Sequence, residues 1–256
     1  MKTILRLLAI FACAASTACF TTSALAQRYS ESEKSSQSYP LAANGTLRLA
    51  NVNGAVEIVA WDKNEVLVET EKRAATSEDL ARIHIVVDAR PDRLIVKTDH
   101  ERTGFFGTSV RGEVLYHLKV PASISLEKIS VVNSTVTVQG VRGSVALETV
   151  NGSIHATDLG ADAKLATVNG SIHAAFATVS ATQRITTDSV NGACELTLPA
   201  GTGAHIDLST VNGSTRCDFP LTIEKSSGRT LRGTIGGGGA TVRADTVNGS
   251  IRLVKL

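Results

Sequence analysis

The chain has 256 residues and is nearly neutral, with 26 Lys and Arg residues against 24 Asp and Glu residues, and only 4% of its residues are aromatic. Because the sequence contains no basic stripe, it excludes a nucleic-acid-binding surface and a polybasic contact with anionic membranes. The few aromatic side chains argue against a carbohydrate groove lined with aromatic platforms, and they predict a thin core of Val, Ile, Leu and Ala.

The first 26 residues have the features of a secretory signal peptide. Lys2 and Arg6 form its positive region, residues 7–20 are apolar or small, and Ala24-Leu25-Ala26 is an A-x-A cleavage site. We therefore expect export with cleavage after Ala26, to the periplasm, the cell surface or the medium. No transmembrane span is expected, because no second run of about 20 apolar residues follows. Cys19 leaves open an acylation site, although the usual upstream Leu is missing.

Residues 27–44 are polar and rich in serine, and we expect a flexible leader there. A β domain is expected over 45–256, with an irregular part at 45–128 and regular repeats at 129–256. The irregular part opens with a strand–turn–strand unit at Gly45–Ile58 and contains a short capped helical turn at Thr76–Arg82. Further strands are predicted at Glu65–Glu71, Ile83–Val87, Leu94–Thr98 and Val114–Val120.

One short motif recurs through the chain. Thr149–Ile154 reads Thr-Val-Asn-Gly-Ser-Ile and is repeated letter for letter at Thr167–Ile172. The steps between central asparagines from Asn133 onward are 18, 18, 22, 21 and 36 residues, and a period near 20 is typical of stacked repeats. The predicted turn residues are Asn53, Gly54, Asn133, Asn151, Gly152, Asn169, Gly170, Asn191, Gly192, Asn212, Gly213, Asn248 and Gly249.

Positions counted from each central Asn form columns. Positions +3 and +5 are mostly apolar, as in Ile154 and Ala156, whereas the position between them is polar, as in His155. This period of two predicts a strand after each turn with one buried and one solvated face. Position −4 is also mostly apolar, which predicts an inward column on a strand that enters the turn.

Two architectures are compatible with these columns. In a single-domain β-solenoid, each unit of about 18–22 residues is one coil with an Asn-Gly corner, and stacking explains why like residues recur at a fixed period. In the alternative, each Asn-Gly pair closes a hairpin and the hairpins form a meander folded into a sandwich or barrel. We favour the all-β solenoid, because a meander gives no reason for the turns to share one sequence.

Two cysteines, Cys194 and Cys217, follow the expected signal peptide. They occupy inward columns of consecutive repeats, at positions +3 and +5. In an ideal stack their Cα atoms lie about 8 Å apart, which exceeds the roughly 7 Å limit for a disulfide. An oxidising compartment favours pairing, so a disulfide and two buried thiols both remain possible.

The sequence also resembles a known family. Gly54 after Val-Asn, Trp61-Asp62, Val66-Leu-Val-Glu-Thr70, Val120-Pro121 and the tandem Val-Asn-Gly-Ser-Ile units are similar to the bacterial "putative adhesin" family of exported β-solenoid domains. The resemblance covers roughly residues 45–256. It implies an all-β solenoid in the cell envelope and, by name only, adhesion, and it supplies no catalytic residues.

Candidate sites for chemistry are few. His155 and His173 share an outward column with Glu195, and two imidazoles with a carboxylate would be weak candidates for a metal site. A solvated strand face is the simpler explanation. Glu148, Asp188 and Asp245 share position −3, but Ala166 and Ser209 interrupt the column, so the carboxylate cluster of a β-helix lyase or hydrolase is not formed. The run Gly236–Gly239 lacks the Gly-Lys-Ser/Thr ending of a phosphate loop and is expected to be a flexible connection.

These patterns predict a non-enzymatic protein without a cofactor. It would display an extended β surface as an adhesin-like or scaffold module, with a protein or surface glycan of the cell envelope as its partner and with possible end-to-end self-association. Two alternatives are a carbohydrate-active β-helix enzyme and a periplasmic sensor or regulatory partner protein. The display residues would be Glu57, His155, His173, Glu195, Arg216 and Arg252.

Overall fold

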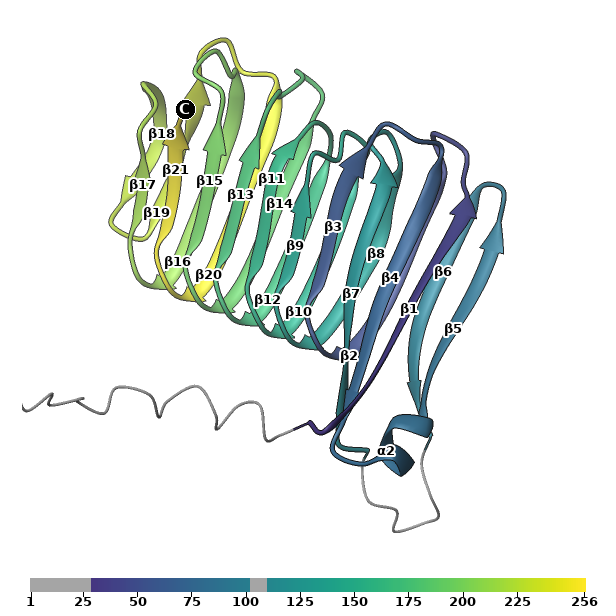
Figure 1. Cartoon of the computed structure of the whole chain (residues 1–256). Coiled ribbons are helices and arrows are strands. Elements are labelled where there is room, and N and C mark those ends of the chain that lie inside the picture. The colour runs from purple at the N-terminus through teal and green to yellow at the C-terminus, as the bar shows by residue number, and fades with distance from the viewer. Residues whose placement is uncertain (1–28, 102–109) are drawn as a thin grey trace, which may run out of the picture.

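The structure is a computed structural model, and it describes residues 29–101 and 110–256. The expected signal peptide at 1–26 and Cys19 lie outside the described residues. Two β-sheets face each other over the length of the molecule, and their strands stack side by side in two layers (Figure 1).

Within the described residues one sheet has ten strands and the other has eleven. In spatial order, the ten-stranded sheet consists of β1 (Glu31–Pro40), β4 (Glu65–Ala74), β7 (Gly112–Pro121), β3 (Val56–Trp61), β9 (Val136–Gln139), β11 (Ile154–Leu159), β13 (Ile172–Phe176), β15 (Cys194–Leu198), β21 (Ile251–Lys255) and β17 (Thr215–Cys217). The eleven-stranded sheet consists of β18 (Leu221–Ser227), β19 (Thr230–Ile235), β16 (Ala204–Asn212), β20 (Ala240–Asn248), β14 (Arg184–Asn191), β12 (Ala163–Asn169), β10 (Val145–Asn151), β8 (Ser125–Asn133), β2 (Thr46–Asn53), β6 (Arg93–His100) and β5 (Ile83–Arg90).

Each Val-Asn-Gly repeat forms one coil, which we name by its central asparagine. A strand of the eleven-stranded sheet enters the Asn-Gly corner and a strand of the ten-stranded sheet leaves it. Neighbouring coils pair in parallel with like residues opposite one another, so that Asn151 faces Asn169 and Ile154 faces Ile172. The predicted solenoid is therefore confirmed, and the alternative meander of hairpins is wrong for the repeat region.

The core lies between the two sheets and is built by the predicted columns. Ile154, Ala156 and Ile172 face inward at 3% exposure or less, and Leu147 and Leu165 face them from the strands that enter the turns. Aliphatic side chains dominate this layer, in agreement with the thin core expected from the composition.

The spatial order of the coils differs from their order in the sequence. At one end the Asn53 coil, made of β2 and β3, lies between the β6–β7 pair and the Asn133 coil. At the other end the Asn248 coil, made of β20 and β21, lies between the Asn191 and Asn212 coils. The 36-residue step from Asn212 to Asn248 contains the antiparallel hairpin of β18 and β19 instead of an extra coil.

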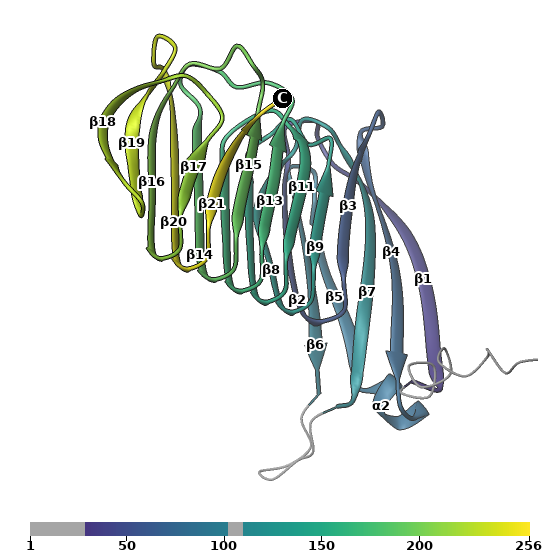
Figure 2. The same cartoon turned by 90° about the vertical axis from the view of Figure 1, so that its left-hand side faces the viewer.

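The expected flexible leader at 27–44 is corrected by the structure. Residues Glu31–Pro40 form β1, which pairs antiparallel with β4 along its whole length. In Figure 2, β1 is the last strand at one end of the stack. As an edge strand it is exposed on most of its length, so a polar serine-rich sequence suits it.

The irregular part of the chain largely follows the predicted strands. Helix α2 (Ser77–Ala81) is the expected helical turn, and the Oγ1 atom of Thr76 accepts a hydrogen bond from the backbone N–H of Asp79 at 3.1 Å. Helix α2 packs near β1, β4 and β5 at the first end of the stack (Figure 1).

Candidate functional site

The central asparagines form one hydrogen-bonded ladder along the corner of the solenoid. From the second asparagine of the row onward, each Nδ2 atom donates to the Oδ1 atom of the asparagine before it in space, with separations of 2.7–2.9 Å. In spatial order the ladder runs through Asn53, Asn133, Asn151, Asn169, Asn191, Asn248 and Asn212. Because all six bonds point the same way, each amide polarises the next and the ladder fixes the register of the coils.

The glycine after each asparagine is required by the close stacking of corners. A Cβ atom on Gly170 would lie 2.0 Å from the carbonyl oxygen of Gly152, and one on Gly192 would lie 1.9 Å from the carbonyl oxygen of Gly170. Since real Cβ atoms do not approach that closely, the repeat excludes other residues there. The close approach of stacked corners, rather than a left-handed backbone, is therefore the main reason for Gly in the regular coils.

Ser134 is the exception at this position. It follows the Asn53 coil, where the buried Asn51 donates from Nδ2 to the carbonyl oxygens of Gly54 and Val114, both at 2.9 Å. In later coils the corner carbonyl instead accepts a hydroxyl of the next coil, as Ser134 accepts from Thr149 at 3.1 Å. The Asn133 coil, which carries Ser at this position, therefore stacks on the corner of the Asn53 coil, which is bonded differently from the later corners.

Buried hydroxyls two residues before the asparagines connect successive coils. Thr167 is 4% exposed and its Oγ1 donates to the carbonyl oxygen of Gly152 at 2.9 Å. Thr210 makes the same bond to Gly249 at 2.9 Å, and Thr246 makes it to Gly192 at 3.2 Å. These bonds satisfy corner carbonyls that the strand ladders leave free.

Thr167→Val keeps the side-chain shape and removes this donor, so we expect a loss of about 1–2 kcal/mol in the free energy of unfolding. Val131 already occupies the equivalent position in the Asn133 coil, so folding should persist. Urea denaturation measures the change. Thr197→Val, at a half-buried outward position, is the control and should stay within about 0.5 kcal/mol of the parent.

The structure brings the three residues of the weak metal candidate into neighbouring positions. His173 lies opposite His155 and Glu195 on the two adjacent strands. The two imidazole rings stack with centroids 5.2 Å apart and planes inclined by 5°. Across the described residues, no group of three or more His, Cys, Asp or Glu side chains is arranged to hold a metal ion.

These residues belong to an outward column of the ten-stranded sheet, which we call the display column. In spatial order it consists of Glu57, Thr137, His155, His173, Glu195, Arg252 and Arg216. Glu57, at one end, accepts from His117 Nδ1 at 2.8 Å, and Arg252, next to the other end, contacts Asp218 at 3.2 Å. Within residues 29–101 and 110–256, neither Glu195 nor Arg216 has an ion pair.

The outward face of the eleven-stranded sheet is different, because its charges largely pair with one another. Arg48 binds Glu127, Lys128 lies 3.4 Å from Glu148, Arg232 lies 2.9 Å from Asp207 and Arg243 lies 2.6 Å from Asp245. These pairs leave this face close to neutral.

The carboxylates at position −3 do not form an acid–base pair. Asp188 faces Asp245 directly, and partial burial followed by the charge of Asp245 raises the pKa of Asp188. Asp245 itself is bound by Arg243, and Ala166 separates Asp188 from Glu148. The arrangement is that of a partly neutralised strand face.

A column of exposed valines was not identified from the sequence. It consists of Val52, Val150, Val168, Val190, Val247 and Val211, which are 39–55% exposed. A shallow groove of about 290 Å³ runs beside Val150, Val168 and Val190. Period-two alternation places the residue before each asparagine outward, so the repeated valine was a signal in the sequence. We call this set the valine column.

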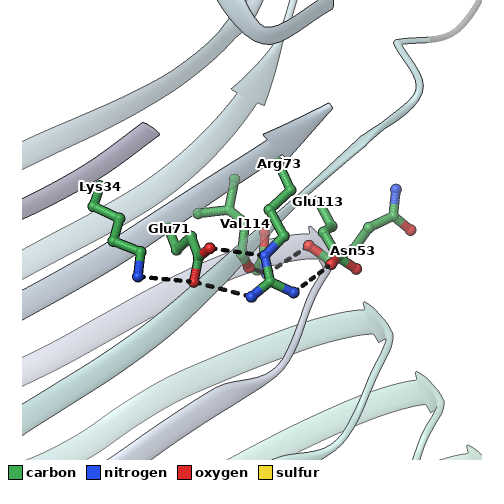
Figure 3. A network of polar contacts seen from close by, with 7 residues as sticks. Lys34, Asn53, Glu71, Arg73, Glu113 and Val114 are labelled. Atoms are coloured by element: carbon green, nitrogen blue, oxygen red, sulfur yellow. Dashed lines mark hydrogen bonds and ion pairs between the residues drawn. The ribbon is translucent and has the colours of Figure 1, made fainter. Parts of the chain in front are cut away.

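A polar network holds the first end of the stack together (Figure 3). Arg73 on β4 binds Glu71 at 3.0 Å and lies 3.6 Å from Glu113 on β7, while Lys34 on β1 lies 4.0 Å from Glu71. The hydrogen bond from Arg73 lowers the pKa of the Glu71 carboxyl. Because the network joins three neighbouring strands through their side chains, its role is structural.

Cys194 and Cys217 are free thiols, so the possible disulfide is not formed. The inserted β21 lies between their strands, with Ile251 opposite Cys194 and Leu253 opposite Cys217. Two strand spacings already separate them by about 9.6 Å, beyond the reach of a disulfide. The sequence-based estimate assumed that consecutive repeats are neighbours, which is wrong at this end.

In a chain beginning at Gln27 we expect two titratable thiols after unfolding in urea. In the native protein Cys194 should be unreactive at pH 8, because burial raises its pKa to about 11. Cys217 is half-buried and should react more slowly than a free thiol, since burial also raises its pKa. An Ellman titration with and without urea measures both, and a urea-unfolded chain with no thiols would contradict the free-cysteine assignment.

Comparisons with known proteins agree with this geometry. A "putative cell adhesion protein" from Clostridium sporogenes ATCC 15579 aligns with a TM-score of 0.50 and 10% identity over 88% of this chain and 100% of that one, which shows the fold alone. A "putative adhesin" from Bacteroides fragilis NCTC 9343 aligns with a TM-score of 0.39 and 11% identity over 87% and 97% of the two chains. No curated protein matches the sequence.

A family model described as Toastrack DUF4097 matches residues 119–254. This match confirms the resemblance noted from the sequence. Since the matched segment is more than half of the chain, the protein belongs to the Toastrack DUF4097 family.

Proposed function

We propose that this protein is an exported, non-enzymatic, adhesin-like or scaffold protein of the cell envelope that binds a partner through an extended β surface. The observation that carries the proposal is the display column. Its central residues His155, His173 and Glu195 stand on three neighbouring strands. Glu195 is without an ion pair among the described residues, whereas the opposite face pairs its own charges. Hydrogen-bonding groups are thus left for an external partner.

The partner class follows from the chemistry of this surface. A row of imidazole, carboxylate and guanidinium groups at strand spacing suits a protein or a surface glycan, both of which present matching donors and acceptors. Rigid stacking of coils adds to affinity, because little conformational entropy is lost when such a surface binds. The valine column is a second candidate surface, since contiguous exposed apolar side chains mark interaction sites.

A carbohydrate-active enzyme is the less favoured alternative. It needs two carboxylates placed across a substrate bond. Asp188 and Asp245 instead lie directly opposite each other on neighbouring strands of one sheet, and Asp245 is held by Arg243. A periplasmic sensor or regulatory protein would use the same display column with a specific protein ligand.

End-to-end self-association remains a proposal, and the edge strands weigh against it. The edge strand β1 carries Glu33 and Lys34, and β18 carries Lys225 beside an irregularity in its pairing with β19. Charges and bulges on edges discourage pairing with another sheet. We therefore expect the purified monomer fraction to remain monomeric in sedimentation at micromolar concentration, and a reversible, concentration-dependent increase in its mass would favour end-to-end association.

The location is tested by protease treatment of intact cells, followed by fractionation and detection of the chain. No helix in residues 29–101 and 110–256 is long and apolar enough to cross a membrane. Loss of the protein from intact cells would place it on the surface and support adhesion. Protection, with release by osmotic shock, would place it in the periplasm, and the partner would then be an internal envelope component.

A further inference from the structure

The Asn248 coil occupies a slot between two coils that are consecutive in the sequence. Its strand β20 pairs in parallel with β14 on one side and with β16 on the other, and β21 pairs likewise with β15 and β17. Asn248 completes the ladder across the slot, donating to Asn191 at 2.7 Å and accepting from Asn212 at 2.9 Å. The slot is therefore one coil wide.

Residues 204–235 are attached to the rest of the stack through this coil. Among the described strands, β16 pairs only with β20 and β19, and β17 pairs only with β21. The inserted coil also buries Val242, Ala244, Ile251 and Leu253 at 1% exposure or less. Filling the slot is thus necessary for the strands of residues 204–235, which are β16 to β19, to join the core.

The walls of the slot select a Val-Asn-Gly coil. A Cβ atom on Gly249 would lie 2.0 Å from the carbonyl oxygen of Gly192, and a Cβ atom on Gly213 would lie 1.9 Å from that of Gly249. Thr246 donates to Gly192 at 3.2 Å. An occupant must therefore carry Thr, Asn and Gly in this spacing, and the same coil of a second copy meets every condition.

A glycine-rich connection joins the inserted coil to the strand before it. Between β19 and β20, Gly236, Gly238 and Gly239 have φ values of 56°, 76° and 120°. Such a segment can straighten and direct the coil into another molecule. The Asn53 coil lacks this freedom, because it leads into β4, which pairs with both β1 and β7.

We propose that this slot is a strand-acceptor site, filled by residues 240–255 of the same chain in the monomer and by those of a second copy in a strand-exchanged dimer. Each contact of the slot is the same in both forms, so only the glycine connection changes. Higher protein concentration during folding therefore favours the dimer. The proposal is independent of the ligand bound by the display column.

The test places a thiol on the inserted coil opposite a native one. In an Ile251→Cys, Cys217→Ser chain, the introduced thiol faces Cys194 on the adjacent strand, within the Cα separation that a disulfide needs. The chain beginning at Gln27, which lacks Cys13 and Cys19, is refolded under reducing conditions at about 1 and about 100 µM, separated by size, and only then oxidised. We expect dimers whose subunits are covalently linked on a non-reducing gel, in a fraction that rises with concentration.

Two further variants make the outcome decisive. Leu253→Cys with Cys194→Ser places the link at Cys217 on the other wall, and it replaces the first variant if that one does not fold. Gly238→Ala strains the closed connection and should raise the dimer-to-monomer ratio about fivefold. Cys217→Ser alone should give no covalent dimer. Covalent monomers at every concentration, or dimers by size that run as monomers on the gel, would overturn the proposal, the latter indicating end-to-end association.

Discussion

Gly170→Ala is expected to lower the free energy of unfolding by at least about 3 kcal/mol, because the new methyl group has no space between coils. Its Cβ atom would lie 2.0 Å from the carbonyl oxygen of Gly152. The neighbouring corner cannot yield locally, since Gly152 is itself held by the hydroxyl of Thr167 and by the asparagine ladder. Relief requires the Asn151 and Asn169 coils to separate, which breaks pairing in both sheets.

Equilibrium denaturation in urea measures this loss, and Gly228→Ala is the matched control. Gly228 lies in the turn between β18 and β19, with no atom within 4 Å of a Cβ placed there. The control should therefore stay within about 0.5 kcal/mol of the parent. Equal effects of the two substitutions would mean that coil stacking does not impose the glycine.

Asn169→Asp is expected to cost about 2 kcal/mol at neutral pH, although the side chain keeps its shape. Asn169 donates to the Oδ1 atom of Asn151 at 2.9 Å and accepts from Nδ2 of Asn191 at 2.8 Å. The introduced carboxylate still accepts from Asn191, but it replaces the donated bond with two facing acceptor oxygens. Protonation restores the donor, so the folded state favours the protonated carboxyl.

The sign of the pH dependence follows from this preference. A carboxyl that is protonated more readily in the folded than in the unfolded chain contributes stability at low pH and loses it as pH rises. The deficit of the Asn169→Asp chain relative to the parent should thus shrink on acidification. Asn64→Asp, at an exposed loop position, serves as the control and should show no such recovery. A deficit independent of pH would contradict a ladder of directed amide bonds.

The repeat predicted the coil, its corner and its inward columns, because each is a local consequence of one motif. Thr-Val-Asn-Gly-Ser-Ile places Thr and Ile inward and Val outward in whichever coil it occurs. The order of the coils could not be predicted for the same reason. Asn248 fits between Asn191 and Asn212 as well as it would fit after Asn212, so the motif contains no information about neighbours.

Composition misled the interpretation at the two ends of the stack. A serine-rich polar segment indicated a leader, yet Glu31–Pro40 forms β1 and pairs with β4. As the edge strand, β1 requires no apolar face. The cysteine distance was estimated between consecutive repeats, and the inserted β21 separates them. The valine column is less apparent from the sequence, because one exposed valine per coil is ordinary and only the stacking of coils brings these side chains into one row.

The central claim, that the display column binds the partner, is tested most directly by co-sedimentation of purified protein with isolated cell envelopes. We predict saturable binding that His155→Gln, His173→Gln and Glu195→Gln together weaken at least about tenfold without changing the melting temperature. Lys128→Gln with Glu148→Gln, which removes a self-contained pair on the opposite face, should bind like the parent. Undiminished binding by the display-column variant would contradict the claim, and a loss confined to Val150→Thr, Val168→Thr and Val190→Thr would assign binding to the valine column instead.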